Sequence, residues 1–340
     1  MNKLIHITDL YHPHNDPDDH FDLSQIFALA KKGDIDLRQI IIDYPAMDFH
    51  GDPALAAVAQ LNMLSGKDVP VVVGADVNKL RGKPELWKDA AHEDVKAADR
   101  IIEILRESED KVYITIVGGC LDTAIALARN PVVFREKCAG IVLNAGSGTN
   151  TPTIEWNVSL GRVEYSAIFS APCPVYWNPC FDNIETGEGR YKTFWKFKME
   201  RVFEKVSSRL NAFYLYMLTK STDGKYLRVL DCPVDEQLLA EWGEKYRNMW
   251  CTGSIFDIGN LTVTPDGKLV PANAGIPSVY SYEPIKITCT EDGVTLWSSL
   301  EENTDHSDVQ EFPRYIFRIN DEERYASAMT EALAEILKQL

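Results

Sequence analysis

Short hydrophobic runs alternate with longer amphipathic stretches along the first 150 residues. The runs are short, rich in β-branched residues and closed by Gly, Asp or Asn, which is typical of strands buried on both faces. They lie at 3–8, 38–43, 69–75, 111–119 and 138–146. The stretches with helical spacing lie at 20–33, 52–66, 93–108 and 121–131. This alternation predicts an α/β fold with an open, mostly parallel sheet and helices on both faces.

The alternation of strands and helices is not continued after this region. Residues 190–250 are rich in aromatic residues and are expected to be mainly helical, whereas 255–300 have the pattern of short strands and turns. A final amphipathic helix is predicted over 320–340. Because the sequence contains no repeat, low-complexity linker or convincing domain boundary, we expect one large domain over 1–340.

Charge and composition exclude several functions. The formal net charge is −16 and no stripe of Lys and Arg offsets it, so nucleic acid is not an expected partner. No apolar run reaches the roughly 20 residues of a membrane span, and the chain enters a strand at once, without a signal-peptide hydrophobic region. The seven scattered cysteines contain no CxxC pair, which favours a reducing compartment and a cytoplasmic location.

Polar residues follow most of the predicted strands. In open α/β sheets, ligands bind outside the carboxyl ends of the strands, so these residues are candidates for a functional site. They are Asp9, the cluster 16–19, Asp43, 118–122 and 143–157. The set is acidic and comes from separate parts of the chain.

The loop after the first strand is especially acidic: residues 7–23 contain five aspartates and three histidines. One interpretation is helix capping, with Asp16 as N-cap, Pro17 in the first turn, and Asp18 and Asp19 complementing the helix dipole. Capping does not require Asp9, however. Oxygen ligands from two elements instead suggest a hard cation such as Ca²⁺ or Mg²⁺.

A minor alternative involves the histidines of this loop. His12-Pro-His14-Asn-Asp16 partly resembles the HxHxDH run of metallo-β-lactamase-like zinc hydrolases. Pro17 stands where that motif has its last His, and no histidine occurs between His92 and His306 to supply further ligands.

Four segments resemble the inosine–uridine nucleoside hydrolase superfamily, and the chain is similar to a divergent member. The family opens with D-x-D-x-G-x-D-D, echoed by Asp9 and by "PDD" at 17–19 around a longer loop. Its G-P-L-T-N-x-A-L-A segment is echoed at 119–128, and its N-x-T-P-x-A-E-F-N segment by "TNTPTIEWN" at 149–157. A late His-Asp pair corresponds to Phe256-Asp257.

This resemblance implies a calcium-dependent hydrolase of N-glycosidic bonds that releases ribose by means of a metal-oriented water. Asp9 would be a metal ligand and the catalytic base. The other ligands would be the carboxylates of Asp19 and Asp257 and the backbone carbonyl of Asp122. The expected substrate-binding residues are Asp18, Asp43, Asn144, Glu155, Trp156 and Asn157.

The sequence departs from the family where the leaving group is protonated. Phe256 cannot donate a proton, so His12 and His14 in the enlarged loop become the candidate acids. A calcium-containing relative that binds a sugar or nucleoside without turnover is the main alternative. In either case the expected partner is a small nucleoside or riboside, and homo-oligomerisation stays open.

Overall fold

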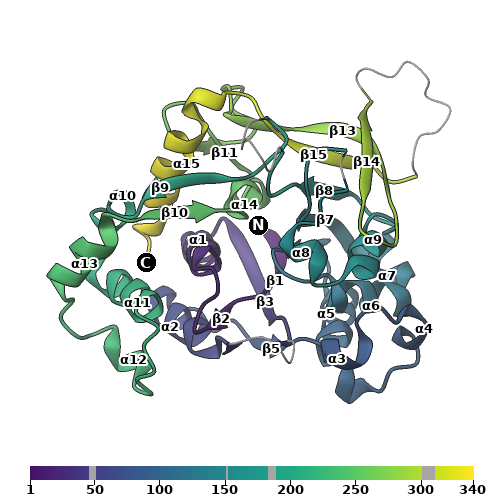
Figure 1. The fold of residues 1–340 in the computed structure, drawn as a ribbon, viewed down its shortest axis with the longest axis horizontal. Helices are drawn as coiled ribbons and strands as arrows, with labels where there is room; N and C mark the ends of the chain where they lie inside the picture. Colours follow the sequence, from purple (N-terminus) through teal and green to yellow (C-terminus); the bar gives the residue numbers. More distant parts are fainter. Residues whose placement is uncertain (46–50, 151, 183–188, 301–310) are drawn as a thin grey trace.

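A single large sheet organises the chain. The computed structural model describes residues 1–45, 51–150, 152–182, 189–300 and 311–340. Within them, a nine-stranded sheet has the order β14-β13-β15-β8-β7-β6-β1-β3-β5 (Figure 1). Its strands are β1 Asn2–Thr8, β3 Ile35–Ile42, β5 Val71–Val73, β6 Val112–Ile116, β7 Cys138–Asn144, β8 Val175–Asn178, β13 Tyr280–Cys289, β14 Thr295–Ser299 and β15 Arg314–Ile319.

The sheet is mostly parallel. Every neighbouring pair from β5 to β15 is parallel, and only β13 runs against the two strands beside it. The carboxyl ends of seven strands therefore meet at one edge, where the sequence places its acidic residues. All five strands predicted in the first 150 residues are present.

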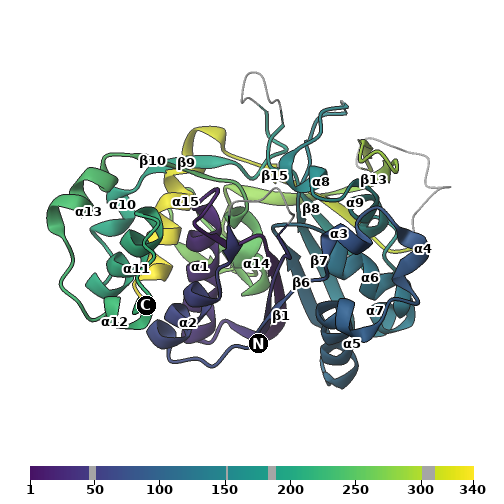
Figure 2. The ribbon, with the colours of Figure 1, turned by 60° about the horizontal axis from the view of Figure 1, so that its bottom comes forward.

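Helices cover both faces of the sheet, as predicted. Along β1, Leu4 packs into the core on one face, whereas Ile5 and Ile7 pack into the core on the other. The first face is covered by α1 Asp18–Lys32, α2 Leu55–Ser65, α11 Ser208–Leu218 and α15 Glu322–Leu337. The second is covered by α5 Lys96–Glu107, α6 Leu121–Arg129, α7 Pro131–Lys137 and α9 Arg162–Ile168 (Figure 2). The fold is thus the predicted single α/β domain.

The region 190–250 is only partly helical. It contains α10 Glu200–Phe203, α11, α12 Tyr226–Val229 and α13 Glu236–Gly243, but also the antiparallel strands β9 Trp195–Lys198 and β10 Tyr246–Met249. The helical prediction is wrong for these two strands. Trp195 and Phe197 alternate with more exposed lysines and bury against the first face, a period of two that the aromatic-rich composition obscures.

The remaining elements are short, apart from the predicted final helix. The region 255–300 holds α14 Ile255–Ile258, β11 Leu261–Val263, β12 Leu269–Pro271, β13 and β14. Others are β2 Tyr11–His12, β4 Asp52–Pro53, α3 Val77–Leu80, α4 Pro84–Trp87, η1 His92–Asp94, α8 Trp156–Ser159 and η2 Thr252–Ser254. The C-terminal helix α15 begins after Asp321, whose carboxylate accepts the backbone N–H of Arg324.

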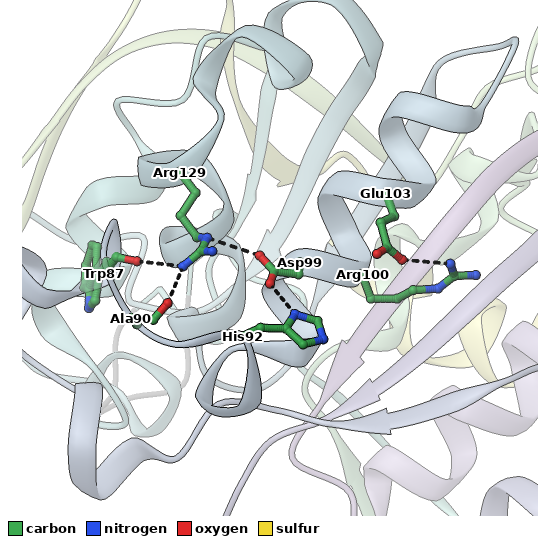
Figure 3. A network of polar contacts seen from close by, with 7 residues as sticks. All are labelled: Trp87, Ala90, His92, Asp99, Arg100, Glu103 and Arg129. Carbon is green, nitrogen blue, oxygen red and sulfur yellow. Dashed lines mark hydrogen bonds and ion pairs between the residues drawn. The ribbon is translucent and has the colours of Figure 1, made fainter.

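A polar network holds the segment between α3 and α5 against α5 and α6 (Figure 3). Asp99 lies 3.1 Å from Arg129 Nε through one oxygen and 2.7 Å from His92 Nδ1 through the other. Arg129 also donates to the carbonyls of Ala90 and Trp87, at 2.9 and 3.5 Å. One carboxylate thus joins two helices to the preceding loop.

In the described part of the chain, no helix combines the length and the apolar character that crossing a membrane requires.

Candidate active site

A cavity of about 360 Å³ opens at the carboxyl edge of the sheet, beyond β1, β6 and β7. Its wall carries five carboxylates, those of Asp9, Asp16, Asp18, Asp19 and Glu155. No Lys, Arg or His is among the described residues that line it. The cavity is therefore suited to a cationic or hydroxyl-rich ligand.

Asp9 and Asp19 both line this cavity. The indole N–H of Trp156 donates to Asp9 Oδ2 at 3.2 Å, and the Thr8 hydroxyl donates to Asp19 Oδ1 at 3.3 Å. Burial raises the pKa of Asp9 to about 6, although the bond from Trp156 opposes the shift. Burial and the neighbouring Asp9 raise the pKa of Asp19 well above its usual range. Both shifts reflect negative charge buried among other carboxylates.

The rest of the acidic loop is arranged by Trp250 and Arg247. Arg247 pairs with Asp16 at 2.8 Å, and the Trp250 indole N–H donates to the other Asp16 oxygen at 3.2 Å. The backbone N–H of Trp250 donates to Asp18 Oδ2 at 3.2 Å. α1 begins at Asp18 with Pro17 as its N-cap and no side-chain capping bond, so the interpretation of Asp16 as a capping residue is wrong.

Asp43 and Asp122 lie beside the cavity rather than in its wall. They line a smaller pocket of about 30 Å³ together with Tyr11. The backbone N–H of Gly119 donates to Asp43 at 2.5 Å, and that of Ala75 donates to Asp122 at 3.0 Å. Burial raises the pKa of both carboxyls, that of Asp122 to about 6. Asp122 is not among the described residues that line the larger cavity, whereas Val117, directly after β6, is.

In the segment 144–157, the side chains of Glu155 and Asn157 are held by backbone groups around them. Glu155 caps α8: its two oxygens accept the N–H groups of Gly146 and Asn157, both at 2.9 Å, and of Val158 at 3.3 Å. Asn157 donates to the carbonyls of Val117 and Asn144, both at 3.0 Å. These bonds occupy groups that were expected to hold sugar hydroxyls, so Glu155 and Asn157 act first as supports of the cavity wall.

Two other expected residues of this segment differ in exposure. The Asn144 side chain is buried and donates to Thr193 Oγ1 at 3.1 Å, and it does not line the cavity. Trp156 lines the cavity and stays 55% exposed.

The loop histidines are not brought to the cavity. His12 Nε2 lies 2.6 Å from the Ser221 carbonyl, and its ring stacks on Tyr216 with centroids 5.3 Å apart. Burial, with Lys220 and Arg247 nearby, lowers the pKa of His14 below its usual value. Neither side chain is placed to protonate a ligand in the cavity. The two also do not converge with Asp16 as zinc ligands.

Asp257 also lies elsewhere. It is not among the described residues that line the cavity, and Asn2, at the amino end of β1, donates to the carbonyl of the next residue, Ile258, at 2.8 Å. Burial raises the pKa of Asp257 to about 8, although the neighbouring Tyr280 hydroxyl opposes the shift. Phe256 is fully buried in the core beside it. The structure therefore contradicts the correspondence of Phe256-Asp257 to a cavity-facing pair, and we leave Asp257 out of the metal site.

The late segment that does line the cavity is Trp250-Cys251, directly after β10. Neither residue is among those predicted from the sequence. Ligand atoms of Cys251, Asp18 and Asp22 lie within 4.8 Å of one another, and all three residues are buried. Asp22 could have been noticed because it follows Asp18 by one helical turn. Nothing in the sequence pattern indicates that Cys251 joins them.

The residues present fit a divalent metal in part. Asp9 and Asp19 supply hard carboxylate oxygens at one cavity, and Arg247 of β10 pairs with Asp16. Asp122 and Asp257 do not complete the expected set. The donors fit a metal without identifying calcium.

Comparison with known proteins agrees with this architecture. An inosine-uridine preferring nucleoside hydrolase from Bacillus anthracis matches with a TM-score of 0.55 and 15% identity over 100% of both chains. A purine-preferring ribonucleoside hydrolase from Gardnerella vaginalis matches with a TM-score of 0.52 and 13% identity over 99% of each. The type III effector protein XopQ, complexed with adenosine diphosphate ribose, gives 0.55 and 12% over 99% of this chain and 92% of its own. No family model and no curated protein matches the sequence. The chain has a divergent nucleoside hydrolase-like fold, which confirms the resemblance at the level of structure.

Proposed function

We propose that this protein is a metal-dependent hydrolase that cleaves the N-glycosidic bond of a nucleoside or related riboside. The observation that carries the proposal is the meeting of Asp9 and Asp19 at an acidic cavity with an aromatic wall. The fold it shares with nucleoside hydrolases supports the same reading, as does the adenosine diphosphate ribose bound by XopQ.

The metal would be held by the carboxylates of Asp9 and Asp19, with the Val117 carbonyl at the same wall as a further oxygen donor. Such donors suit Ca²⁺. When bound, the metal would polarise a water and lower its pKa.

Asp9 would act as the general base. Its carboxylate lines the cavity, where it can accept a proton from an attacking water. The Trp156 N–H would hold Asp9 in place for this transfer. The surrounding carboxylates would stabilise the positive charge that develops on the sugar in an oxocarbenium-like transition state.

The sugar and the base would be held by different parts of the wall. Asp18 has a second carboxylate oxygen besides the one bonded to Trp250, and it would accept a sugar hydroxyl. Trp156, Phe181 and Trp250 line the cavity and would stack on an aromatic base.

Release of ribose from a panel of purine, pyrimidine and pyridine nucleosides tests the proposal. We expect turnover that requires a divalent metal and falls by about 10²–10⁴ in Asp9→Asn, the scale of losing a general base. Asp68→Asn, at an exposed site, is the matched control and should keep full activity. Equal rates in Asp9→Asn and the wild type would contradict the assignment of Asp9.

A riboside-binding protein without turnover is the second candidate. It is favoured by one observation: among the described residues that line the cavity, none is a histidine that could protonate a departing base. Calorimetric binding of ribose or a nucleoside with no release of ribose would decide for this candidate.

A further inference from the structure

The wall of the cavity holds more negative charge than the proposed metal can balance. Each of its five carboxylates accepts a hydrogen bond from an N–H or O–H group, as ionised carboxylates do. Arg247 offsets one of these charges by pairing with Asp16 at 2.8 Å. A divalent metal would offset two more. Two negative charges of the wall therefore remain for the ligand to balance.

Aromatic rings line the same wall as these carboxylates. They belong to Trp156, Phe181 and Trp250. The indole N–H of Trp156 donates to Asp9, and that of Trp250 donates to Asp16, each at 3.2 Å. A flat cation would be attracted by both kinds of group, by the carboxylates through its charge and by the indole rings through cation–π interactions.

The departure of the base sets a further requirement. A neutral purine or pyrimidine leaves readily only when it is protonated, and a general acid contributes about 10²- to 10⁴-fold to such a step. No His, Lys or Tyr is among the described residues that line the cavity, and the carboxylates there are hydrogen-bonded as acceptors. A base whose positive charge lies on the glycosidic nitrogen needs no acid, because it departs as a neutral molecule.

We infer that, within the proposed hydrolase function on which this step rests, the substrates are ribosides of a cationic base, such as an N-ribosyl pyridinium. Water attacks C1′ as the C1′–N bond breaks, and the electron pair of that bond goes to the nitrogen. Asp9 accepts a proton of the water and later releases it to solvent. The products are ribose, a neutral pyridine and one proton, and no proton is transferred to the base.

Release of ribose from nicotinamide riboside, uridine and inosine tests the reaction. In the presence of Ca²⁺, and after subtraction of each spontaneous rate, we expect kcat/KM of the full chain to be at least about 100-fold higher for nicotinamide riboside, because the two neutral bases lack the acid they need. Values for uridine or inosine that equal or exceed the value for nicotinamide riboside would overturn the inference.

Binding of 1-methylnicotinamide and nicotinamide tests the recognition of charge without turnover. The two rings are nearly equal in size, but only the first carries a positive charge. We expect calorimetry of the full chain with Ca²⁺ to give a Kd at least about 10-fold lower for the cation. Asp18→Asn should reduce this ratio because it removes one charge of the wall, whereas Asp68→Asn, at an exposed position, should keep it. Equal Kd values for the two compounds in the wild type would overturn the inference.

The two experiments separate this inference from the proposed hydrolysis. If no riboside releases ribose while 1-methylnicotinamide binds more tightly than nicotinamide, the hydrolysis is wrong and the preference for a cationic base is retained. If uridine and inosine are cleaved as well as nicotinamide riboside, the hydrolysis is confirmed and the preference is wrong.

Discussion

Asp257 offers a sharp test of the electrostatics of this core. Its carboxyl is buried beside Tyr280, and its pKa is raised from 3.8 to about 8. The folded state therefore holds a proton that the unfolded state releases near pH 4. Replacement by Asn removes the titration while keeping a neutral group of similar size.

The sign and size follow from proton linkage. A raised pKa in the folded state contributes stability that is fully present below the unfolded pKa. This contribution is lost as the pH rises towards the folded value. For one group the loss is about 1.4 kcal/mol per pH unit, between pH ~4 and ~8, and above pH ~8 the contribution is constant. From pH 5.5 to 7.5, the wild type should lose roughly 2.7 kcal/mol more than Asp257→Asn.

Urea unfolding followed by tryptophan fluorescence at pH 5.5, 6.5, 7.5 and 8.5 measures the difference. Chelator in every sample removes metal effects, and titration of the other buried carboxyls cancels between the two proteins. Asp68→Asn, at an exposed position, should run parallel to the wild type. If Asp257→Asn also runs parallel to the wild type, the carboxyl does not hold an extra proton and the reasoning is refuted.

Three other predictions concern the cavity. Chelation should lower the melting temperature, and Ca²⁺ at 100 times its Kd should raise the free energy of unfolding by about 2.7 kcal/mol. Asp19→Asn should lose this response to Ca²⁺, whereas Asp257→Asn should keep it. Scanning calorimetry measures both. Glu155→Ala should lower the free energy of unfolding by at least about 3 kcal/mol, because three buried backbone N–H groups lose a charged acceptor. If urea unfolding shows little change in this free energy, Glu155 does not have the structural role described. Trp156→Ala should raise KM for nucleosides by roughly 3- to 10-fold through lost stacking, whereas Trp156→Phe should keep a KM near that of the wild type; equal KM values in all three proteins would exclude stacking.

The fold was predictable because its signals are local. Each of the five strands in the first 150 residues is indicated by a run of β-branched residues, and Asp9 lies just beyond the first strand. The position of Asp9 at the cavity follows from the rule that parallel strands end at one edge. Its partner Asp19 follows from the helix that starts immediately after the loop.

The rest of the site depends on contacts between distant segments. The two-residue echo Phe256-Asp257 carries no information about where α14 packs, and Asp257 is not among the described residues that line the cavity. Cys251 meets Asp18 and Asp22 only because β10 pairs with β9 and ends beside α1. Glu155 was expected to hold sugar hydroxyls because its residue type suits that role. Its three backbone partners become visible only once the loop is built.

The order of strands in the sheet has a consequence for how the chain must be made. β15 lies between β8 and β13 in the sheet, although the whole segment of residues 179–313 separates it from β8 in the sequence. At about 5–20 residues per second, the ribosome needs on the order of 10 s to synthesise that segment. During this time the edge of β8 offers unpaired backbone groups to other chains, a template for aggregation. The recombinant yield of this protein should therefore increase at lower growth temperature and with chaperones that shield nascent chains. The increase should be larger than for a protein whose strands pair in sequence order.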